Sequence, residues 1–281
     1  MLQNNMIMKN IKINNNPIGI FDSGVGGLNI MNEIHKILPM ENIVYFADTL
    51  NLPYGSKSKD KIIDLSRKIS FFLVKKKVKL IVIACNTASI FSLNIMKNFK
   101  IPMLGVIDPC IKFAILKSKN MKIGIIGTEA TVNSNLYVNK INKIAKYNVY
   151  QQACPLFVPF VEEGIINGNI IDVIIKKYLD SLLKIDIDTL ILGCTHYSFL
   201  KKALIKNIKK KISIIDPSKY MAQEVLNVLK KKSLISENRF KKNYSFLKIY
   251  VSCNEKKFKN TYYKLFNKKI FNVKKVNLED M

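Results

Sequence analysis

The stretch Asp188-Thr-Leu-Ile-Leu-Gly-Cys-Thr-His-Tyr-Ser198 is similar to an earlier one, Lys79-Leu-Ile-Val-Ile-Ala-Cys-Asn-Thr-Ala-Ser89, and this repeat indicates the fold. Each stretch is an apolar run followed by a small residue, a cysteine and polar residues. Short apolar runs are typical of strands buried on both faces of a parallel sheet. Polar residues directly after such strands lie at their carboxyl ends, where α/β folds place their sites. The sequence therefore predicts Cys85 and Cys194 at equivalent positions in two α/β units.

The repeat extends to two further pairs of segments. Ile18-Gly-Ile-Phe-Asp22 is similar to Ile123-Gly-Ile-Ile-Gly127, and Ile107-Asp-Pro109 is similar to Ile215-Asp-Pro217. All the pairs occur in the same order at nearly one spacing, which indicates duplicated units. We predict an α/β fold of two pseudo-symmetric α/β domains with mostly parallel sheets. The active site is expected in the cleft between them, because domain interfaces commonly hold small-molecule sites.

The chain of 281 residues is long enough for two ordinary domains. Residues 1–16 are polar and are predicted to form a flexible extension. The first α/β domain is predicted over residues 17–110 and the second over residues 111–221. Residues 222–281 have no counterpart and are expected to form a helix, a strand, a helix and a last strand that complete the first domain.

Two proline-containing segments are expected to lack helical structure. Residues 102–109 are predicted to form a strand that ends at Asp108-Pro109, and residues 157–164 are predicted to form a loop.

The net charge of +26 suggests nucleic-acid binding, but the residue types disfavour it. Only Arg67 and Arg239 are arginines, the residue best suited to reading guanine edges and phosphates, and the lysines are spread along the chain. No apolar run approaches the ~18 residues of a membrane span. Five cysteines without a CxxC pair suit a reduced compartment. We expect a cytoplasmic protein that binds neither nucleic acid nor membrane.

A glycine-rich loop, Asp22-Ser-Gly-Val-Gly-Gly27, follows the first predicted strand. It does not match a dinucleotide site, because Asn29 stands where a third glycine is needed, and no P-loop lysine follows. Its free backbone N–H groups could hold a small anion such as a carboxylate. Alternatively, the glycines serve only a tight turn.

Four segments together resemble the cofactor-independent aspartate/glutamate racemase superfamily. They are Phe21-Asp-Ser-Gly-Val-Gly-Gly-Leu28, Pro53-Tyr-Gly-Ser56, Ala84-Cys-Asn-Thr-Ala-Ser89 and Gly193-Cys-Thr-His196, and the resemblance runs from about residue 17 to residue 218. It implies two related α/β domains and racemisation without a cofactor. The motifs favour glutamate as substrate over aspartate, and the product D-glutamate would serve peptidoglycan synthesis.

The chemistry of racemisation agrees with two matched cysteines. Inversion at a carbon needs a base on one face and an acid on the other, and a thiol with a pKa of ~8.5 can serve as either. A cysteine between a strand end and a helix start is also expected to favour the thiolate. We therefore predict Cys85 and Cys194 as the catalytic residues. Cys110, Cys154 and Cys253 are expected to be structural.

The resemblance also assigns the neighbours of the two thiols. It places Asp22 with Cys85 and His196 with Cys194 as groups that move protons, while His35 is expected to be structural. None of the four segments contains Lys or Arg, so hydroxyl and N–H groups would hold an anionic amino acid. Thr128, Thr131 and Glu162 could take part as in the family, or could simply cap helices. The predicted substrate-binding residues are Asp22, Ser23, Tyr54, Gly55, Asn86, Thr87, Thr195 and His196.

Three other interpretations remain open at the level of sequence. Cys85, Cys194 and His196 could bind zinc, although the local spacing Cys-x-His is uncommon. The two cysteines could form a reversible disulfide as a redox switch. Within the superfamily, aspartate is the alternative substrate. No metal or other cofactor is expected, and the sequence does not predict an oligomeric state.

The N-terminal extension suggests a possible activator. Some members of the family carry a comparable extension and are activated by a UDP-linked muramyl-alanine. By this resemblance, Lys9 and Lys12 would meet the diphosphate. A passive terminal tail is the alternative interpretation.

Overall fold

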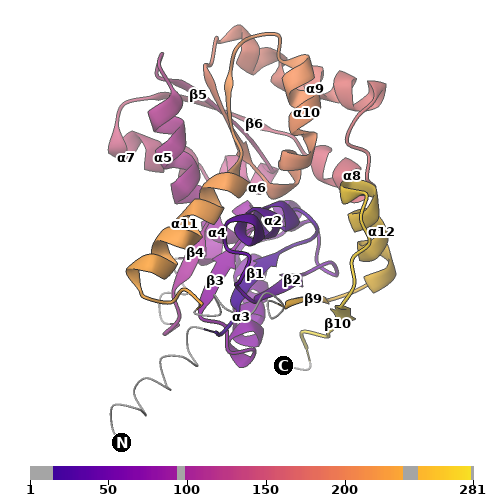
Figure 1. The fold of residues 1–281 in the computed structure, drawn as a ribbon. Helices are drawn as coiled ribbons and strands as arrows, with labels where there is room; N and C mark the ends of the chain where they lie inside the picture. Colours follow the sequence, from indigo (N-terminus) through magenta and orange to yellow (C-terminus); the bar gives the residue numbers. More distant parts are fainter. Residues whose placement is uncertain (1–14, 94–98, 237–245, 280–281) are drawn as a thin grey trace, which may run out of the picture.

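The computed structural model describes residues 15–93, 99–236 and 246–279. The expected extension, with Lys9 and Lys12, lies outside these ranges except for its last two residues. The described chain forms two parallel β-sheets with helices around them, and Figure 1 shows the second sheet above the first. The predicted α/β class with mostly parallel sheets is therefore confirmed.

The first sheet has the strand order β10-β9-β2-β1-β3-β4, with every pair parallel. Its central strands are apolar and buried along their whole length, as the short apolar runs predicted. The strands are β1 (Ile18–Asp22), β2 (Ile43–Ala47), β3 (Leu80–Ile83), β4 (Met103–Gly105), β9 (Leu247–Val251) and β10 (Val273–Lys275).

The second sheet has the order β6-β5-β7-β8, again with every pair parallel. This order repeats the order β2-β1-β3-β4 of the first sheet strand for strand. The duplicated sequence segments thus occupy equivalent strands or the residues directly after them. The strands are β5 (Lys122–Gly127), β6 (Asn148–Ala153), β7 (Thr189–Gly193) and β8 (Ser213–Ile215).

Helices connect the parallel strands, as crossover connections require. Several begin with a side-chain cap: the side chains of Ser58, Thr128 and Asp216 accept hydrogen bonds from backbone N–H groups in the first turn. The helices are α2 (Leu28–Ile37), α3 (Lys59–Lys75), α4 (Asn86–Ser92), α5 (Ile107–Lys117), α6 (Glu129–Asn133), α7 (Leu136–Ile144), α8 (Phe157–Glu162), α9 (Asn169–Lys184), α10 (Lys201–Asn207), α11 (Pro217–Lys231) and α12 (Glu255–Phe266), with the 3₁₀ turns η1 (Tyr54–Ser56) and η3 (Thr195–Leu200).

The C-terminal segment joins the first sheet. Strand β9 pairs with β2, and β10 pairs with β9, so the expected helix–strand–helix–strand order is present as α11, β9, α12 and β10. Helix α12 lies beside α8 of the second unit (Figure 1), where Lys257 pairs with Glu163. The C-terminal segment therefore contacts both units.

The two proline-containing segments differ from the expectation. Residues 157–162 form helix α8 and not a loop, and Ile107 to Pro109 begin helix α5 and do not end a strand. In each case the proline, Pro159 or Pro109, lies in the first turn of the helix. There a backbone N–H has no intrahelical acceptor, so proline costs little. The loop prediction for residues 157–164 was therefore wrong. The strand predicted over residues 102–109 is present as β4 but ends at Gly105, before the Asp108-Pro109 pair.

The predicted division into domains at residues 110 and 221 remains a prediction. Helix α5 continues past residue 110 and helix α11 continues past residue 221, so neither boundary coincides with a loop. Helix α11 packs on α2 of the first unit and on α5.

The buried apolar side chains form two clusters, because successive residues of a strand face opposite sides of the sheet. Ile20 of β1 belongs to a large cluster that also contains Ile125 of β5, so this core is continuous between the two units. Phe21 belongs to a smaller cluster between the first sheet and α3. Over the described ranges, no helix has the length and apolar character needed to cross a membrane.

Candidate active site

Nine of the ten predicted site residues line one pocket between the two units. The pocket is narrow, and the space of about 280 Å³ between its lining atoms includes solvent at its mouth. The first sheet and the second both contribute to it. The lining residues are Ser23, Pro53, Tyr54, Gly55, Cys85, Asn86, Thr87, Thr128, Val158, Cys194, Thr195 and His196.

Cys85 and Cys194 occupy equivalent positions in this pocket. Cys85 follows β3 and precedes α4, and Cys194 follows β7 and precedes η3. Their relative exposures are 6% and 7%, so each thiol is buried but reaches the pocket. The equivalence arises because β3 and β7 hold the same place in their sheets. Two thiols from opposite sheets thus share one small cavity.

The environment of Cys85 does not favour a thiolate, contrary to the expectation from its position. Burial raises the pKa of the Cys85 thiol well above its usual range, and the negative charge of Asp22 raises it further. A hydrogen bond from the backbone of Ala88 opposes these effects only in part. Without substrate, Cys85 is therefore a protonated thiol that can donate a proton.

Asp22 lies outside the pocket lining, behind the residues that form it. Its carboxylate is fully buried at the end of β1 and accepts hydrogen bonds from Gly24 N (2.9 Å) and Thr195 Oγ1 (3.0 Å). Burial raises the pKa of Asp22, while the nearby charge of His196 and these hydrogen bonds oppose that rise. Asp22 is thus placed to influence the thiol of Cys85 and to hold Thr195 of the opposite unit.

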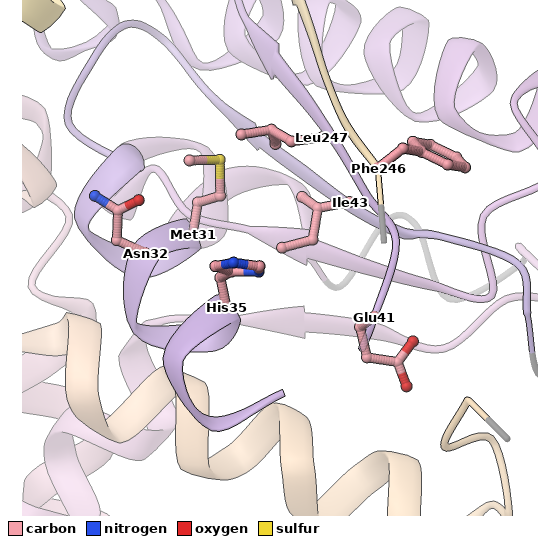
Figure 2. A pocket seen from close by; sticks show the side chains of 7 residues that line it. All are labelled: Met31, Asn32, His35, Glu41, Ile43, Phe246 and Leu247. Carbon is pink, nitrogen blue, oxygen red and sulfur yellow. The ribbon is translucent and has the colours of Figure 1, made fainter. Parts of the chain in front are cut away.

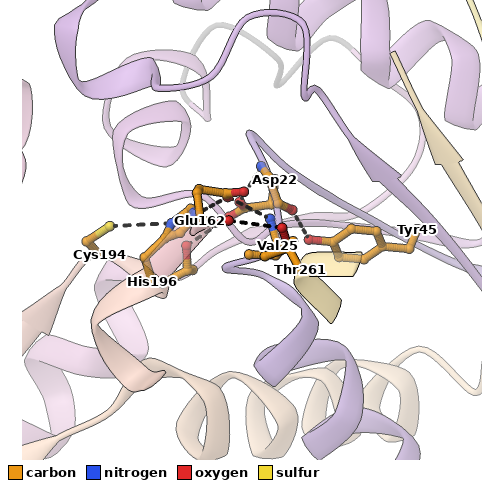
Figure 3. A network of polar contacts seen from close by, with 9 residues as sticks. Asp22, Val25, Tyr45, Glu162, Cys194, His196 and Thr261 are labelled. Atoms are coloured by element: carbon orange, nitrogen blue, oxygen red, sulfur yellow. Dashed lines mark hydrogen bonds and ion pairs between the residues drawn. The ribbon is translucent and has the colours of Figure 1, made fainter. Parts of the chain in front are cut away.

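His196 lies between Cys194 and Glu162, as Figure 3 shows. Its Nδ1 is 3.9 Å from Cys194 Sγ, and its Nε2 is 2.7 Å from Glu162 Oε1. Burial alone would lower the pKa of His196, but the hydrogen bonds to Cys194 and Glu162 and the charge of Glu162 raise it well above its usual value. The imidazole is therefore protonated and sits against the Cys194 sulfur.

Glu162 joins three parts of the chain around His196. It lies at the end of α8, where Oε1 also accepts a hydrogen bond from Val25 N (3.2 Å) in the glycine-rich loop. Its backbone oxygen accepts a hydrogen bond from Thr261 Oγ1 (2.9 Å) in α12. The position of Glu162 thus depends on the glycine-rich loop and on the C-terminal segment.

The glycine-rich loop needs its glycines for close approach to the opposite unit. A Cβ at Gly26 would lie 2.6 Å from His196 Nδ1 and closer still to Thr195 Oγ1. A Cβ at Gly24 would collide with Leu52 and with Glu162 Oε1. These distances are shorter than van der Waals contact allows, so a side chain at either position would force the opposing residues to shift. The loop is therefore a contact surface between the units as well as a turn.

Hydroxyl groups of both units meet on another side of the pocket. Thr87 Oγ1 lies 3.1 Å from Thr128 Oγ1, which lies 3.0 Å from Thr131 Oγ1. Thr128 also caps α6 by accepting a hydrogen bond from Thr131 N. The same residue therefore caps a helix and lines the pocket. Gly55 packs closely against Thr128, because a Cβ at Gly55 would lie only 2.6 Å from Thr128 Cβ.

Tyr54 is held in the pocket by a buried carboxylate. Its hydroxyl donates to Asp48 Oδ2 (2.7 Å), and Asp48 Oδ1 accepts a hydrogen bond from Ser252 Oγ (2.7 Å). Ser252 directly follows β9, so the C-terminal segment supports the loop that carries Tyr54. The sequence did not predict this link, because Asp48 and Ser252 are 204 residues apart.

A second pocket lies away from the predicted site residues, between α2 and the segment that leads into β9 (Figure 2). His35 lines it as an exposed side chain, together with Glu41. Glu41 forms an ion pair with Lys79 (2.6 Å) and accepts a hydrogen bond from Ser236 N (2.8 Å). Glu41 thus holds Lys79 and Ser236 together within the first unit, which is a structural role.

The pocket between the units includes Val158, which the sequence did not single out, because α8 was expected to be a loop. Tyr137 of α7 was also missed: its hydroxyl donates to Asn86 Oδ1 (2.7 Å).

The described part of the chain holds no group of three or more His, Cys, Asp or Glu side chains arranged to bind a metal ion. The cysteines are all free thiols.

A family model described as Asp/Glu/Hydantoin racemase matches residues 33–225, and the chain belongs to this family. Among curated relatives, the glutamate racemase of Carboxydothermus hydrogenoformans is 40% identical over 93% of this chain and 96% of its own length. That of Persephonella marina is 46% identical over 77% of this chain and 82% of its own. A solved structure of Francisella tularensis glutamate racemase with D-glutamate has a TM-score of 0.87 and 34% identity, covering 95% of this chain and all of that one.

Two more distant structures share the fold. The aspartate racemase of Picrophilus torridus has a TM-score of 0.56 at 18% identity, over 79% of this chain and 99% of that one. The Escherichia coli glutamate racemase, solved with L-glutamate and the activator UDP-MurNAc-ala, has a TM-score of 0.76 at 23% identity, over 93% of this chain and 98% of its own.

Proposed function

We propose that this chain interconverts L- and D-glutamate by moving a proton at the α-carbon between Cys85 and Cys194. The observation that carries the proposal is the meeting of two thiols, from equivalent strand ends of opposite sheets, in one small pocket. Two such groups on opposite faces of a carbon supply the base and the acid that inversion needs. The relatives named glutamate racemase support the substrate.

On one face of the substrate, Cys194 acts with His196 and Glu162. The protonated imidazole lies beside the Cys194 sulfur, and Cys194, acting as a thiolate, removes the α-proton of L-glutamate. Glu162 holds the ring through Nε2, which leaves Nδ1 toward the sulfur. In the reverse direction, the proton returns from the Cys194 thiol to the α-carbon.

On the other face, Cys85 acts with Asp22. Because burial and Asp22 keep the Cys85 thiol protonated, it is ready to protonate the carbanion and so complete D-glutamate. The carbanion gains the proton and Cys85 becomes a thiolate. For D-glutamate as substrate, the Cys85 thiolate removes the proton instead, and its formation is the costly step because the site disfavours that charge.

The substrate carboxylates would be bound without a cationic side chain. The pocket lining in the described chain contains neither Lys nor Arg. Hydroxyl and amide groups instead offer hydrogen bonds to an anion, and backbone N–H groups add to them. We assign this binding to the predicted set: Ser23, Tyr54, Gly55, Asn86, Thr87, Thr195 and His196, with Asp22 acting from behind Thr195.

The cellular role that we propose is to supply D-glutamate for peptidoglycan synthesis in the cytoplasm. Free thiols suit a reduced compartment and support this location. A UDP-muramyl-alanine activator is a further proposal, supported by its presence in the Escherichia coli structure. Its test compares the full chain with a chain starting at Asn16, each with and without the precursor. Equal activity in all four assays would exclude activation.

The proposed reaction is tested by incubating the protein with each enantiomer of glutamate in deuterated water. We expect both to racemise and the newly formed enantiomer to carry deuterium at the α-carbon. L-aspartate, assayed in parallel, should react far more slowly. Absence of glutamate turnover, or faster turnover of aspartate, would contradict the proposal.

A further inference from the structure

Tyr137 contacts a predicted substrate-binding residue from the opposite unit. It is the second residue of α7, is fully buried, and donates its hydroxyl hydrogen bond to Asn86 Oδ1 at 2.7 Å. Asn86 begins α4 directly after Cys85 and is 2% exposed. The bond therefore joins the two units beside one of the two thiols.

The amide nitrogen of Asn86, Nδ2, has no hydrogen-bond partner among the residues that the structure describes. Among buried side-chain polar atoms of the described chain, Asn86 Nδ2 is one of the few that lack a hydrogen bond, and no other member of that group lines this pocket. A buried donor without an acceptor costs free energy, so such atoms call for an explanation in function. A carboxylate oxygen in the pocket would supply the missing acceptor.

The orientation of the amide decides whether the pocket attracts or repels an anion. Reversing the amide would turn Oδ1, an acceptor only, toward a substrate carboxylate. It would also leave the phenol proton of Tyr137 without an acceptor. Burial raises the pKa of Tyr137 well above its usual value, so the phenol stays protonated and remains a donor. The phenol proton therefore favours the orientation that presents Nδ2.

We propose that Tyr137 is a positioning residue that fixes the Asn86 amide with Nδ2 toward the substrate. The chemical class that it selects for is a carboxylate, and it does so in a pocket whose lining lacks Lys and Arg. This inference rests on the proposed glutamate racemisation. It extends that function by assigning part of anion recognition to a side chain that does not touch the substrate.

The experiment measures L-glutamate binding by calorimetry and racemisation kinetics for the wild type, Tyr137→Phe, Asn86→Ala and the double variant. Removing the phenol oxygen frees the amide to turn, so Tyr137→Phe should raise KM and Kd about 5- to 30-fold and lower kcat much less. Asn86→Ala should raise both constants about 10- to 100-fold. In the double variant, Tyr137→Phe should add nothing, because its effect passes through Asn86.

Tyr147→Phe is the matched control. Tyr147 Oη donates to Ile115 O (3.3 Å) within the second unit, outside the pocket, so its loss should leave KM and Kd unchanged. Equal KM and Kd for Tyr137→Phe and wild type, or additive effects in the double variant, would overturn the inference. If the wild type binds glutamate without racemising it, the proposed reaction fails, while the Kd comparison still decides the role of Tyr137. A wild type that does not bind glutamate refutes both.

Discussion

His196 Nε2 lies 2.7 Å from Glu162 Oε1, and this contact fixes the charge and the direction of the imidazole beside Cys194. The two residues come from separate elements of the second unit, η3 and α8. Glu162 also accepts a hydrogen bond from Val25 N of the first unit, so the position of the Glu162 carboxylate depends on how closely the two units approach. Changes at Glu162 should therefore affect the imidazole and the contact between the units together.

Glu162→Gln should lower the pKa of His196, because the hydrogen bond can remain while the negative charge is lost. We expect kcat/KM to fall roughly tenfold or more. The limb of the pH–rate profile that reports the imidazolium should move to lower pH. Glu163→Gln is the control, since Glu163 is an exposed partner of Lys257. An unchanged profile for Glu162→Gln would contradict the assigned role of this carboxylate.

The contact between His196 and Glu162 should also affect the stability of the fold in a defined pH range. Since the folded pKa of His196 is raised above the unfolded value of ~6.5, its stabilising contribution is fully present below about pH 6.5. The contribution is lost as pH rises through the folded pKa. The difference in the free energy of unfolding between wild type and Glu162→Gln should therefore shrink as pH rises. A difference that grows with pH would have the wrong sign.

Gly26→Ala should reduce activity by separating the two units at the site. Its Cβ would overlap His196 and Thr195, so the loop must move away from both. Gly168→Ala provides a contrast: Gly168 has a φ of +97° but no atom within 4 Å of its Cβ position. Because φ +97° with ψ 174° is a region that essentially only glycine adopts, that substitution should cost about 1–3 kcal/mol of stability and leave activity unchanged. Full activity in folded Gly26→Ala would refute the close-approach argument.

Ser252→Ala should weaken the support of Tyr54 by removing a donor to the buried Asp48. We expect a loss of about 1–3 kcal/mol in the free energy of unfolding and a higher KM for glutamate. Ser118→Ala removes a hydroxyl–carboxylate hydrogen bond of similar length, to Asp188 before β7, away from the pocket. It should lower stability without changing KM. Identical KM effects in the two variants would show that Ser252 has only a structural role.

Activity should persist after exhaustive dialysis and in the presence of a chelator, because the proposed reaction uses only thiols and their neighbours. The zinc alternative predicts the opposite outcome. Loss of activity with a chelator and recovery with added Zn²⁺ would support a metal site that includes Cys85, Cys194 and His196.

The duplicated segments allowed the two parallel sheets to be predicted from sequence, and with them the common pocket of Cys85 and Cys194. Cys85 and Cys194 each follow a buried parallel strand, and equivalent strands in two sheets bring them to one pocket. The helices at Phe157 and Ile107 could not be recognised, because a proline in the first turn gives the same local signal as a break.

Residues that act through long-range contacts left no local signal. Tyr137 reaches Asn86 across 51 positions, and nothing around Tyr137 distinguishes it from an ordinary core tyrosine of a short helix. The protonation of Cys85 was also not predictable from its place after a strand. The burial and the neighbouring Asp22 charge that raise its pKa depend on the assembled units.

Racemisation by two thiols, one removing and one supplying the proton, is tested by assaying Cys85→Ala and Cys194→Ala with both enantiomers. Each variant should be folded, as judged by circular dichroism, and inactive in both directions, because one face of the α-carbon loses its proton carrier and inversion needs both. The corresponding serine variants should retain at most a trace, since a hydroxyl is a much weaker acid than a thiol. Substantial racemisation by either alanine variant would contradict the account.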